Sequence, residues 1–261
     1  MNKEKEPIFI SCKCITYARV NTLEESIMSF LKQDYPSDRC ELIIVNDYPL
    51  QTLIYDHPQI KIFNLEDTFS TIGDKENLAI HLCKGDIIAV WDDDDIALSN
   101  HLQNIAKFWK HDTNLLHWQK GVYYNNESIT DIISVGNSGI AYSKRAWQEI
   151  GRSPIENAGG DMTMVVKLHN LGRDKVVLAN PDDKDVSWFY RWAGNDVYHQ
   201  SGQGTDVKGK PNIIQRHSLY IEGLRHAGKI PTGLIELKPH WKHYYDKMLL
   251  NFIKNDTRRN L

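Results

Sequence analysis

Residues 87–95 run Ile87-Ile88-Ala89-Val90-Trp91-Asp92-Asp93-Asp94-Asp95, so that an apolar pentapeptide leads directly into four aspartates. The apolar run has the length and the β-branched content of a strand buried on both faces, as in a parallel sheet. Open α/β sheets bind ligands at the carboxyl ends of their strands, where these acids are expected to lie. Adjacent like charges repel one another, and oxygen ligands suit Mg²⁺ or Mn²⁺ bound together with phosphates. A solvated acidic turn or a helix cap is the simpler alternative.

The composition is that of an ordinary globular protein. The chain has 261 residues, of which 41% are hydrophobic and 25% charged, and this length can bury a core without crosslinks. The cysteines lie in or beside apolar runs without a CxxC pair, which favours reduced core thiols over a zinc site; they are Cys12, Cys14, Cys40 and Cys83. No signal peptide or long apolar segment is visible, and we expect a cytoplasmic protein.

The charge is distributed unevenly along the chain. Residues 205–261 hold 11 Lys and Arg against 5 Asp and Glu, whereas the whole chain has a net charge of −3. The acidic body argues against a nucleic-acid partner. The basic segment carries aromatic and apolar residues expected on one helix face, namely Trp241, Tyr244, Tyr245, Leu249, Leu250 and Phe252. Such a face suits packing on the body, a homodimer interface or peripheral contact with an anionic membrane.

Strand and helix patterns alternate on the N-terminal side of the acid run. Apolar runs predict strands at 7–15, 40–45 and 60–64, and helical spacing predicts helices at 22–33 and 74–81. A strand, a helix and a strand in about 40 residues form a parallel βαβ unit with a right-handed crossover. The polar residues that follow the strands, at 16–19, 46–47 and 92–95, are therefore expected to meet at one crevice.

The C-terminal side continues with mixed elements. The patterns predict strands at 115–124, 128–135, 140–142 and 175–178, and helices at 98–109, 144–150 and 161–171. An aromatic run follows at 187–192, and the tail after residue 210 is predicted to be loop and helix.

Four of these segments together resemble family 2 glycosyltransferases of the GT-A fold. They are Thr16 to Arg19 after the first strand, Asn46-Asp47 after the second, Gly73 to Asn77 opening a helix, and Trp91 to Asp95. The resemblance covers roughly residues 7–200. It implies an α/β, Rossmann-like fold with a mixed, mostly parallel central sheet flanked by helices, and a C-terminal helical extension.

The resemblance also implies a domain division. Residues 1–6 would be a disordered N-terminus, and residues 7–204 a glycosyltransferase domain. Its first half, 7–98, would bind the nucleotide-sugar and its second half, 99–204, the acceptor. Residues 205–261 would be a basic, aromatic extension.

By the same resemblance, the nucleotide-sugar pocket would be lined by Thr16, Tyr17, Arg19, Asp47, Lys75, Asn77, Asp92 and Asp93. Asp94 would be a direct ligand of Mn²⁺ or Mg²⁺, with Asp92 and His199 as further ligands. The ion would bridge the diphosphate and neutralise the charge that grows as the sugar leaves. Glu76 stands where the family usually has Arg, and Lys75 is the candidate for the missing positive charge.

Asp161 falls where the family carries its catalytic base. A carboxylate at this place takes the proton of the acceptor hydroxyl as the oxygen attacks the anomeric carbon, and direct displacement inverts the configuration. The resemblance further places Trp188, Arg191 and Trp192 in a loop that contacts the acceptor or phosphate.

Each assignment has a simpler alternative. Asp161 suits a helix cap, Asp47 an Asx-turn and Tyr17 a packing aromatic. The tryptophans can simply pack, Arg191 can pair with an acid, and His199 can be a surface histidine.

The leading functional hypothesis is a metal-dependent inverting glycosyltransferase. It would move a sugar from a nucleotide-diphospho-sugar, with a UDP-sugar as first candidate, to a hydroxyl of a glycan or lipid-linked acceptor. A sugar-1-phosphate nucleotidyltransferase is the second hypothesis; such enzymes usually have a glycine-rich loop after the first strand, and residues 14–21 contain no glycine. A non-catalytic nucleotide-sugar-binding protein is the third, favoured by Glu76 and by the single acid at Asp161.

Overall fold

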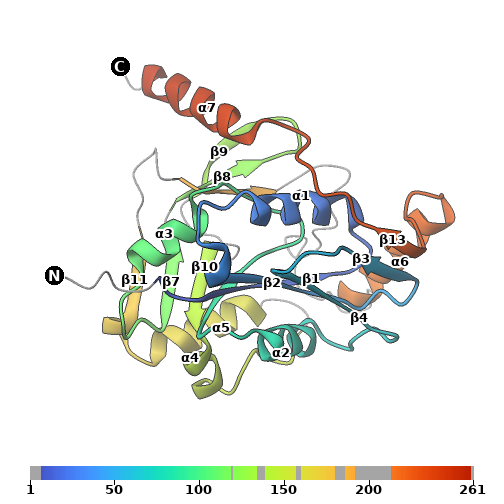
Figure 1. The fold of residues 1–261 in the computed structure, drawn as a ribbon, viewed down its shortest axis with the longest axis horizontal. Coiled ribbons are helices and arrows are strands. Elements are labelled where there is room, and N and C mark those ends of the chain that lie inside the picture. The colour runs from blue at the N-terminus through green and yellow to red at the C-terminus, as the bar shows by residue number, and fades with distance from the viewer. Residues whose placement is uncertain are drawn as a thin grey trace.

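A seven-stranded mixed sheet forms the centre of the molecule (Figure 1). The computed structural model describes residues 7–118, 120–133, 139–156, 160–179, 186–191 and 213–259. Along the sheet the strands follow the order β11 (Val176–Ala179), β7 (Leu115–Trp118), β10 (Ile140–Ser143), β5 (Ile87–Val90), β1 (Ile10–Thr16), β2 (Cys40–Asn46) and β4 (Ile60–Asn64). β10 runs antiparallel to β5 and β7, whereas β1, β2, β4 and β5 are parallel. The predicted mixed, mostly parallel α/β sheet is confirmed.

Helices cover both faces of this sheet (Figure 1). One face packs against α1 (Val20–Leu31) and α3 (His101–Phe108), and the other against α2 (Ile72–Leu82), α4 (Lys144–Glu149) and α5 (Gly160–Asn170). Successive side chains of a strand point to opposite faces, so Leu42 and Ile44 join the first core and Ile43 the second. Every residue of β5 is buried, as predicted from the apolar run.

Several element boundaries differ from the prediction by a few residues. Helix α2 begins two residues early because Thr71 caps it, with its hydroxyl accepting from the Asp74 amide at 3.1 Å. One-turn 3-10 helices also occur at Ser37–Arg39 and Arg173–Lys175. The four cysteines are free and buried, which confirms their prediction as core thiols.

The single strand predicted at residues 115–124 is wrong. The segment divides into β7 of the central sheet and β8 (Gly121–Tyr124), which belongs to a second sheet with the order β6 (Ile96–Ala97), β12 (Trp188–Arg191), β8 and β9 (Ile129–Ile133). Both halves have the apolar pattern of a strand, so the periodicity does not reveal where the chain changes sheets. Gly121 allows the change, because a Cβ there would lie 2.4 Å from the Trp188 ring.

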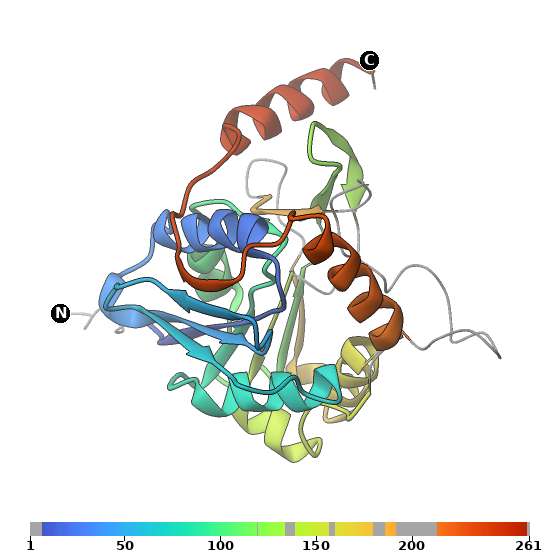
Figure 2. The same cartoon turned by 90° about the vertical axis from the view of Figure 1, so that its right-hand side faces the viewer.

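The C-terminal segment packs onto the body at three places. It contains α6 (Ile213–His226), β13 (Gly233–Glu236) and α7 (Tyr245–Arg259). Strand β13 pairs in parallel with β3 (Gln51–Ile54), and neither strand was predicted. In Figures 1 and 2, α7 lies beside the hairpin of β8 and β9.

The predicted inner face of α7 is only partly correct. Tyr245 and Leu249 are buried four residues apart, but Tyr244 and Leu250 are exposed. In the part of the chain that the structure describes, no helix combines the length and apolar character needed to cross a membrane.

Gly73 marks a close approach between α2 and the loop after α4. A Cβ at this position would lie 1.8 Å from the carbonyl oxygen of Pro154. We expect Gly73→Ala to lower the free energy of unfolding by about 1–3 kcal/mol, because the backbone must shift to relieve the overlap. Urea denaturation measures the loss. At the helical control position Gly223 a Cβ meets open space, and Gly223→Ala should stabilise by up to about 1 kcal/mol. Equal losses in both variants would contradict the close approach.

Candidate functional site

The polar loops after β1, β2 and β5 meet at one edge of the sheet, as predicted. The Arg19 guanidinium donates to Asp93 Oδ1 and to Asp94 Oδ2, both at 2.9 Å. From α2, Lys75 donates to the Thr16 carbonyl at 2.6 Å and also pairs with Asp47. Side-chain contacts therefore join the loop after β1 to the carboxyl ends of β2 and β5.

The acid run is held in place by burial and by hydrogen bonds to other segments of the chain. Asp93, Asp94 and Asp95 are buried, and Asp92 is half-buried. The Ser26 hydroxyl donates to the Asp92 carbonyl at 2.9 Å, and the Arg191 amide donates to Asp95 Oδ1 at 2.8 Å. This burial excludes the solvated acidic turn that the sequence left open.

Burial and neighbouring charges shift the pKa values of the charged groups in the site. Burial raises the pKa of Asp93, and neither Arg19 nor Lys75 fully offsets this because the Asp94 carboxylate raises it further. Burial disfavours the charged form of Arg19, but Asp93 and Asp94 outweigh this and raise the pKa of the guanidinium. Arg19 therefore pairs with two buried carboxylates at once.

The acid run fits a hard divalent cation. Asp93 Oδ2 is buried, and within the described ranges it makes no hydrogen bond of standard geometry, although the nearby Thr16 side chain partly offsets the rise that burial causes in the pKa of Asp93. Also within those ranges, no three His, Cys, Asp or Glu side chains are arranged to hold a metal ion. Mg²⁺ typically uses only one or two protein carboxylates together with substrate phosphates. Asp92 and Asp94 are the candidates for such a set, and His199 lies outside the described residues.

The residues predicted to line the nucleotide pocket include a buried ion pair, and a pair of aromatic rings lies close to it. The Asp47 carboxylate accepts from the Phe69 amide at 3.0 Å and from Lys75. Burial lowers the pKa of Lys75, and the Asp47 charge offsets this only in part. The Tyr17 ring lies 4.9 Å from the Tyr48 ring, edge to face, and 5.8 Å from Lys75 Nζ.

The C-terminal segment also packs against residues of this predicted pocket. Ile221 of α6 and Ile230 are buried against Ala18 and Tyr48, and half-buried Tyr17 packs on the same cluster. Sequence patterns do not reveal this contact, because Ile221 lies 203 positions after Ala18 and 173 after Tyr48.

The buried ion pair of Lys75 and Asp47 is expected to contribute strongly to the free energy of unfolding. Both side chains are buried, so Lys75→Met leaves the Asp47 charge without its cation. We expect the free energy of unfolding to fall by about 3–5 kcal/mol. The matched control is Lys84→Met, because the Lys84 side chain is 65% exposed and lies 3.8 Å from Glu41; it should cost less than about 1 kcal/mol. Chemical denaturation of the two variants compares the losses, and similar values would contradict the buried pair.

Three predicted ligand contacts have structural partners instead. Asn77 exchanges two hydrogen bonds with the Ser153 backbone, at 2.9 and 3.1 Å, and so fixes the loop after α4. Trp188 is buried in the core, as in the packing alternative. Arg191 is also buried and pairs with Glu25 at 3.0 Å, so its guanidinium is committed to an acid inside the protein.

Glu76, which departs from the family pattern, has an internal cation. Lys13 of β1 is buried and pairs with the Glu76 carboxylate. Burial disfavours the charged ammonium, but Glu76 and Asp92 outweigh this and raise the pKa of Lys13. Sequence reasoning missed Lys13, although a lysine within an apolar strand signals a buried pair.

The structure describes Asp161, which the sequence proposes as the catalytic base. Asp161 is in the first turn of α5, half-buried, with Oδ1 accepting from the Met162 amide at 2.7 Å. The predictions for Trp192 and His199, and the prediction that residues 1–6 are disordered, fall outside the described residues.

A mixed sheet with helices on both faces and an acid run at the carboxyl end of a central strand is the arrangement of GT-A glycosyltransferases. The sequence profile described as Glycosyl transferase family 2 matches residues 13–153, more than half of the chain. The chain belongs to this family. A comparison with curated proteins finds no match.

Solved structures share the fold at low sequence identity. Staphylococcus aureus TarS 1–349 in complex with UDP-GlcNAc has a TM-score of 0.60 and 15% identity, over 94% of this chain and 72% of that one. The mannosyltransferase PcManGT from Pyrobaculum calidifontis, in complex with GDP-Man and Mn²⁺, has a TM-score of 0.55 and 13% identity, over 84% and 70%. A further structure of TarS 1–349 has a TM-score of 0.55 and 15% identity, over 70% of this chain and only 60% of that one. The same protein in complex with UDP has a TM-score of 0.57 and 17% identity, over 73% and 62%.

Proposed function

We propose that the chain transfers a sugar from a nucleotide-diphospho-sugar to an acceptor hydroxyl with inversion at the anomeric carbon. The observation that carries the proposal is the buried acid run at the end of β5, held by Arg19 within a member of family 2. A UDP-sugar is the first candidate donor, and the complexes of structural neighbours with UDP, UDP-GlcNAc and GDP-Man support this donor class.

The donor would bind in the half formed by residues 7–98. Tyr17 and Asp47 would contact the nucleobase, and Thr16 and Arg19 line the same pocket. Asp94, with Asp92, would hold Mn²⁺ or Mg²⁺ together with the diphosphate, and the complex of a neighbour with Mn²⁺ supports this choice. When bound, the cation supplies charge neutralisation for the leaving diphosphate.

Asp161 would act from the acceptor-binding half, residues 99–204. Its carboxylate takes the proton from a hydroxyl of a glycan or lipid-linked acceptor. The acceptor oxygen then forms its bond to the anomeric carbon from the face opposite the diphosphate. The bond between that carbon and the phosphate oxygen breaks, and the nucleoside diphosphate leaves with the electron pair.

A donor screen tests this proposal. The purified chain is mixed with UDP-, GDP- and dTDP-sugars, each with Mn²⁺, with Mg²⁺ or with EDTA. We expect one nucleotide class to raise the melting temperature in a cation-dependent way and to release nucleoside diphosphate slowly into water. Absence of both binding and release for all three classes would refute the proposal, and binding without release under any condition would favour a non-catalytic protein.

A further inference from the structure

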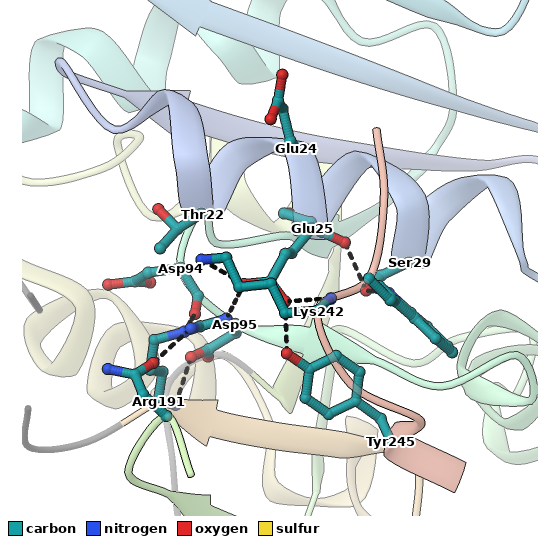
Figure 3. Close-up of polar contacts among 12 residues, drawn as sticks. Thr22, Glu24, Glu25, Ser29, Asp94, Asp95, Arg191, Lys242 and Tyr245 are labelled. Carbon is teal, nitrogen blue, oxygen red and sulfur yellow. Dashed lines mark hydrogen bonds and ion pairs between the residues drawn. The ribbon is translucent and has the colours of Figure 1, made fainter. Parts of the chain in front are cut away.

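A buried glutamate of α1 joins the C-terminal segment to the acid run. Glu25 is 0% exposed, and Figure 3 shows it between Tyr245 and Lys242 on one side and Arg191 on the other. Its Oε1 accepts from the Tyr245 hydroxyl and from the Lys242 amide, the latter at 3.2 Å. Its Oε2 accepts from Arg191 at 3.0 Å and lies 3.3 Å from Lys242 Nζ.

Arg191 continues this connection to the acids. Its Nε donates to the main-chain carbonyl of Asp94 at 2.5 Å, and its own amide donates to Asp95 Oδ1 at 2.8 Å. A third contact reaches Asn126, which follows β8. Arg191 therefore holds both the backbone and a side chain of the loop that carries the candidate metal ligands.

Three partners stabilise the charged form of the buried Glu25 carboxylate. Burial alone would raise the pKa of Glu25, but Arg191, Tyr245 and Lys242 together lower it. A buried carboxylate that loses its partners costs several kcal/mol. The Tyr245 ring also packs edge to face against three aromatic rings. Its centroid lies 5.5 Å from those of Tyr124 and Phe189 and 5.4 Å from that of Trp241.

Two further contacts hold the same stretch of chain against α1. The Lys238 amide donates to Glu24 at 2.6 Å, and the Trp241 indole donates to Ser29 at 3.1 Å. Residues 238–249 thus lie along α1 and end at the first turns of α7, where Tyr245 and Leu249 are buried.

We propose that the C-terminal segment supports the donor site through Tyr245. Glu25 and Tyr245 act as positioning residues, which fix the Asp94–Asp95 loop through Arg191. This inference rests on the proposed function and adds to it a role for the C-terminal segment. Tyr245 and Glu25 do not touch the donor. They reduce the freedom of the loop, and a preorganised site binds its ligand without having to order that loop first.

The test compares Tyr245→Phe with Tyr244→Phe. The first change removes one hydroxyl from the group around Glu25 and keeps the ring; the second removes a hydroxyl from a side chain that is 79% exposed. We expect Tyr245→Phe to raise KM for the donor about tenfold, with a much smaller change in kcat, because a loosened loop weakens donor binding. Hydrogen exchange of the amides at 92–97 should become faster by a similar factor. Tyr244→Phe should match the unmodified protein in both measurements.

Two further variants, Glu25→Gln and Lys242→Met, should change the donor KM and the exchange rates by a larger and a smaller factor, respectively. Glu25→Gln keeps an oxygen acceptor but removes the charge opposite Arg191, and it should exceed Tyr245→Phe in both measurements. The Lys242 side chain is 44% exposed, so Lys242→Met should change KM less than about threefold. Lys247→Met, at an exposed position of α7, is its control. If Glu25→Gln fails to fold, Tyr245→Phe carries the comparison alone.

The outcomes separate this inference from the proposed function. Suppose that the unmodified protein binds and turns over donor, and that Tyr245→Phe and Tyr244→Phe have equal hydrogen-exchange rates and equal donor KM values. This result overturns the inference and leaves the proposed function intact. Faster exchange with unchanged KM also overturns it, because the contact is then structural only. If the unmodified protein binds no donor, the proposed function fails, and the exchange rates alone decide whether Tyr245 holds the loop.

Discussion

Replacing Asp94 by alanine is expected to lower kcat/KM for sugar transfer by about 10³-fold and to abolish the cation-dependent part of nucleotide binding. Asp94 is buried at the carboxyl end of β5, where the candidate cation and the diphosphate would meet. The fold should survive, because Arg19 keeps its contact with Asp93. Initial-rate kinetics and calorimetric titration with UDP, each with and without Mn²⁺, measure the two losses.

The control lies at the other end of the same strand. Asp86 precedes β5 and is exposed, so Asp86→Ala removes a carboxylate from the chain without touching the site. It should retain full turnover and cation dependence. Normal turnover by Asp94→Ala would rule out the assignment of the acid run.

Asp161→Asn is expected to lower kcat about 10²- to 10⁴-fold while donor affinity stays within about twofold, because the base acts on the acceptor and not on the nucleotide. The amide keeps the shape and the acceptor oxygen for the Met162 amide, but it cannot take a proton. Steady-state kinetics with saturating donor, together with titration of UDP, separates the two effects.

Asp174→Asn is the matched control for this change. Asp174 is exposed in the turn after α5, and its amide variant should have normal kcat. NMR of the product formed by the unmodified enzyme should show the anomeric configuration opposite to that of the donor. Unchanged kcat in Asp161→Asn would remove this residue from the mechanism, and retained configuration would exclude direct displacement.

The sequence was sufficient for the parallel strands of the central sheet and for the convergence of their polar loops. A continuous apolar run followed by acids identified β5, and the alternation of strand and helix patterns identified the parallel units beside it. These signals are local, because burial on both faces and helical spacing are visible within about ten residues. Arg19 was accordingly expected near the acids that it contacts, whereas Lys75 was placed in the same pocket by the family resemblance.

The contacts that the sequence did not reveal are long-range. Glu25 and Arg191 are 166 positions apart, and Lys13 and Glu76 are 63 apart. Strand β13 pairs with β3, which lies 182 residues earlier in the chain. Periodicity describes which face of an element is buried, but it does not say which charge meets which across the fold. For that reason Arg191 and Asn77 were assigned to ligands, whereas the structure gives them partners within the protein.

The central claim is that the acids after β5 bind a divalent cation that carries the donor diphosphate. Crystals of the protein grown with UDP and Mn²⁺, measured at the manganese absorption edge, test it most directly. We predict an anomalous peak at bonding distance from the Asp94 carboxylate and from both phosphates of UDP. Ordered UDP without such a peak, with Arg19 still bonded to Asp93 and Asp94, would contradict the account.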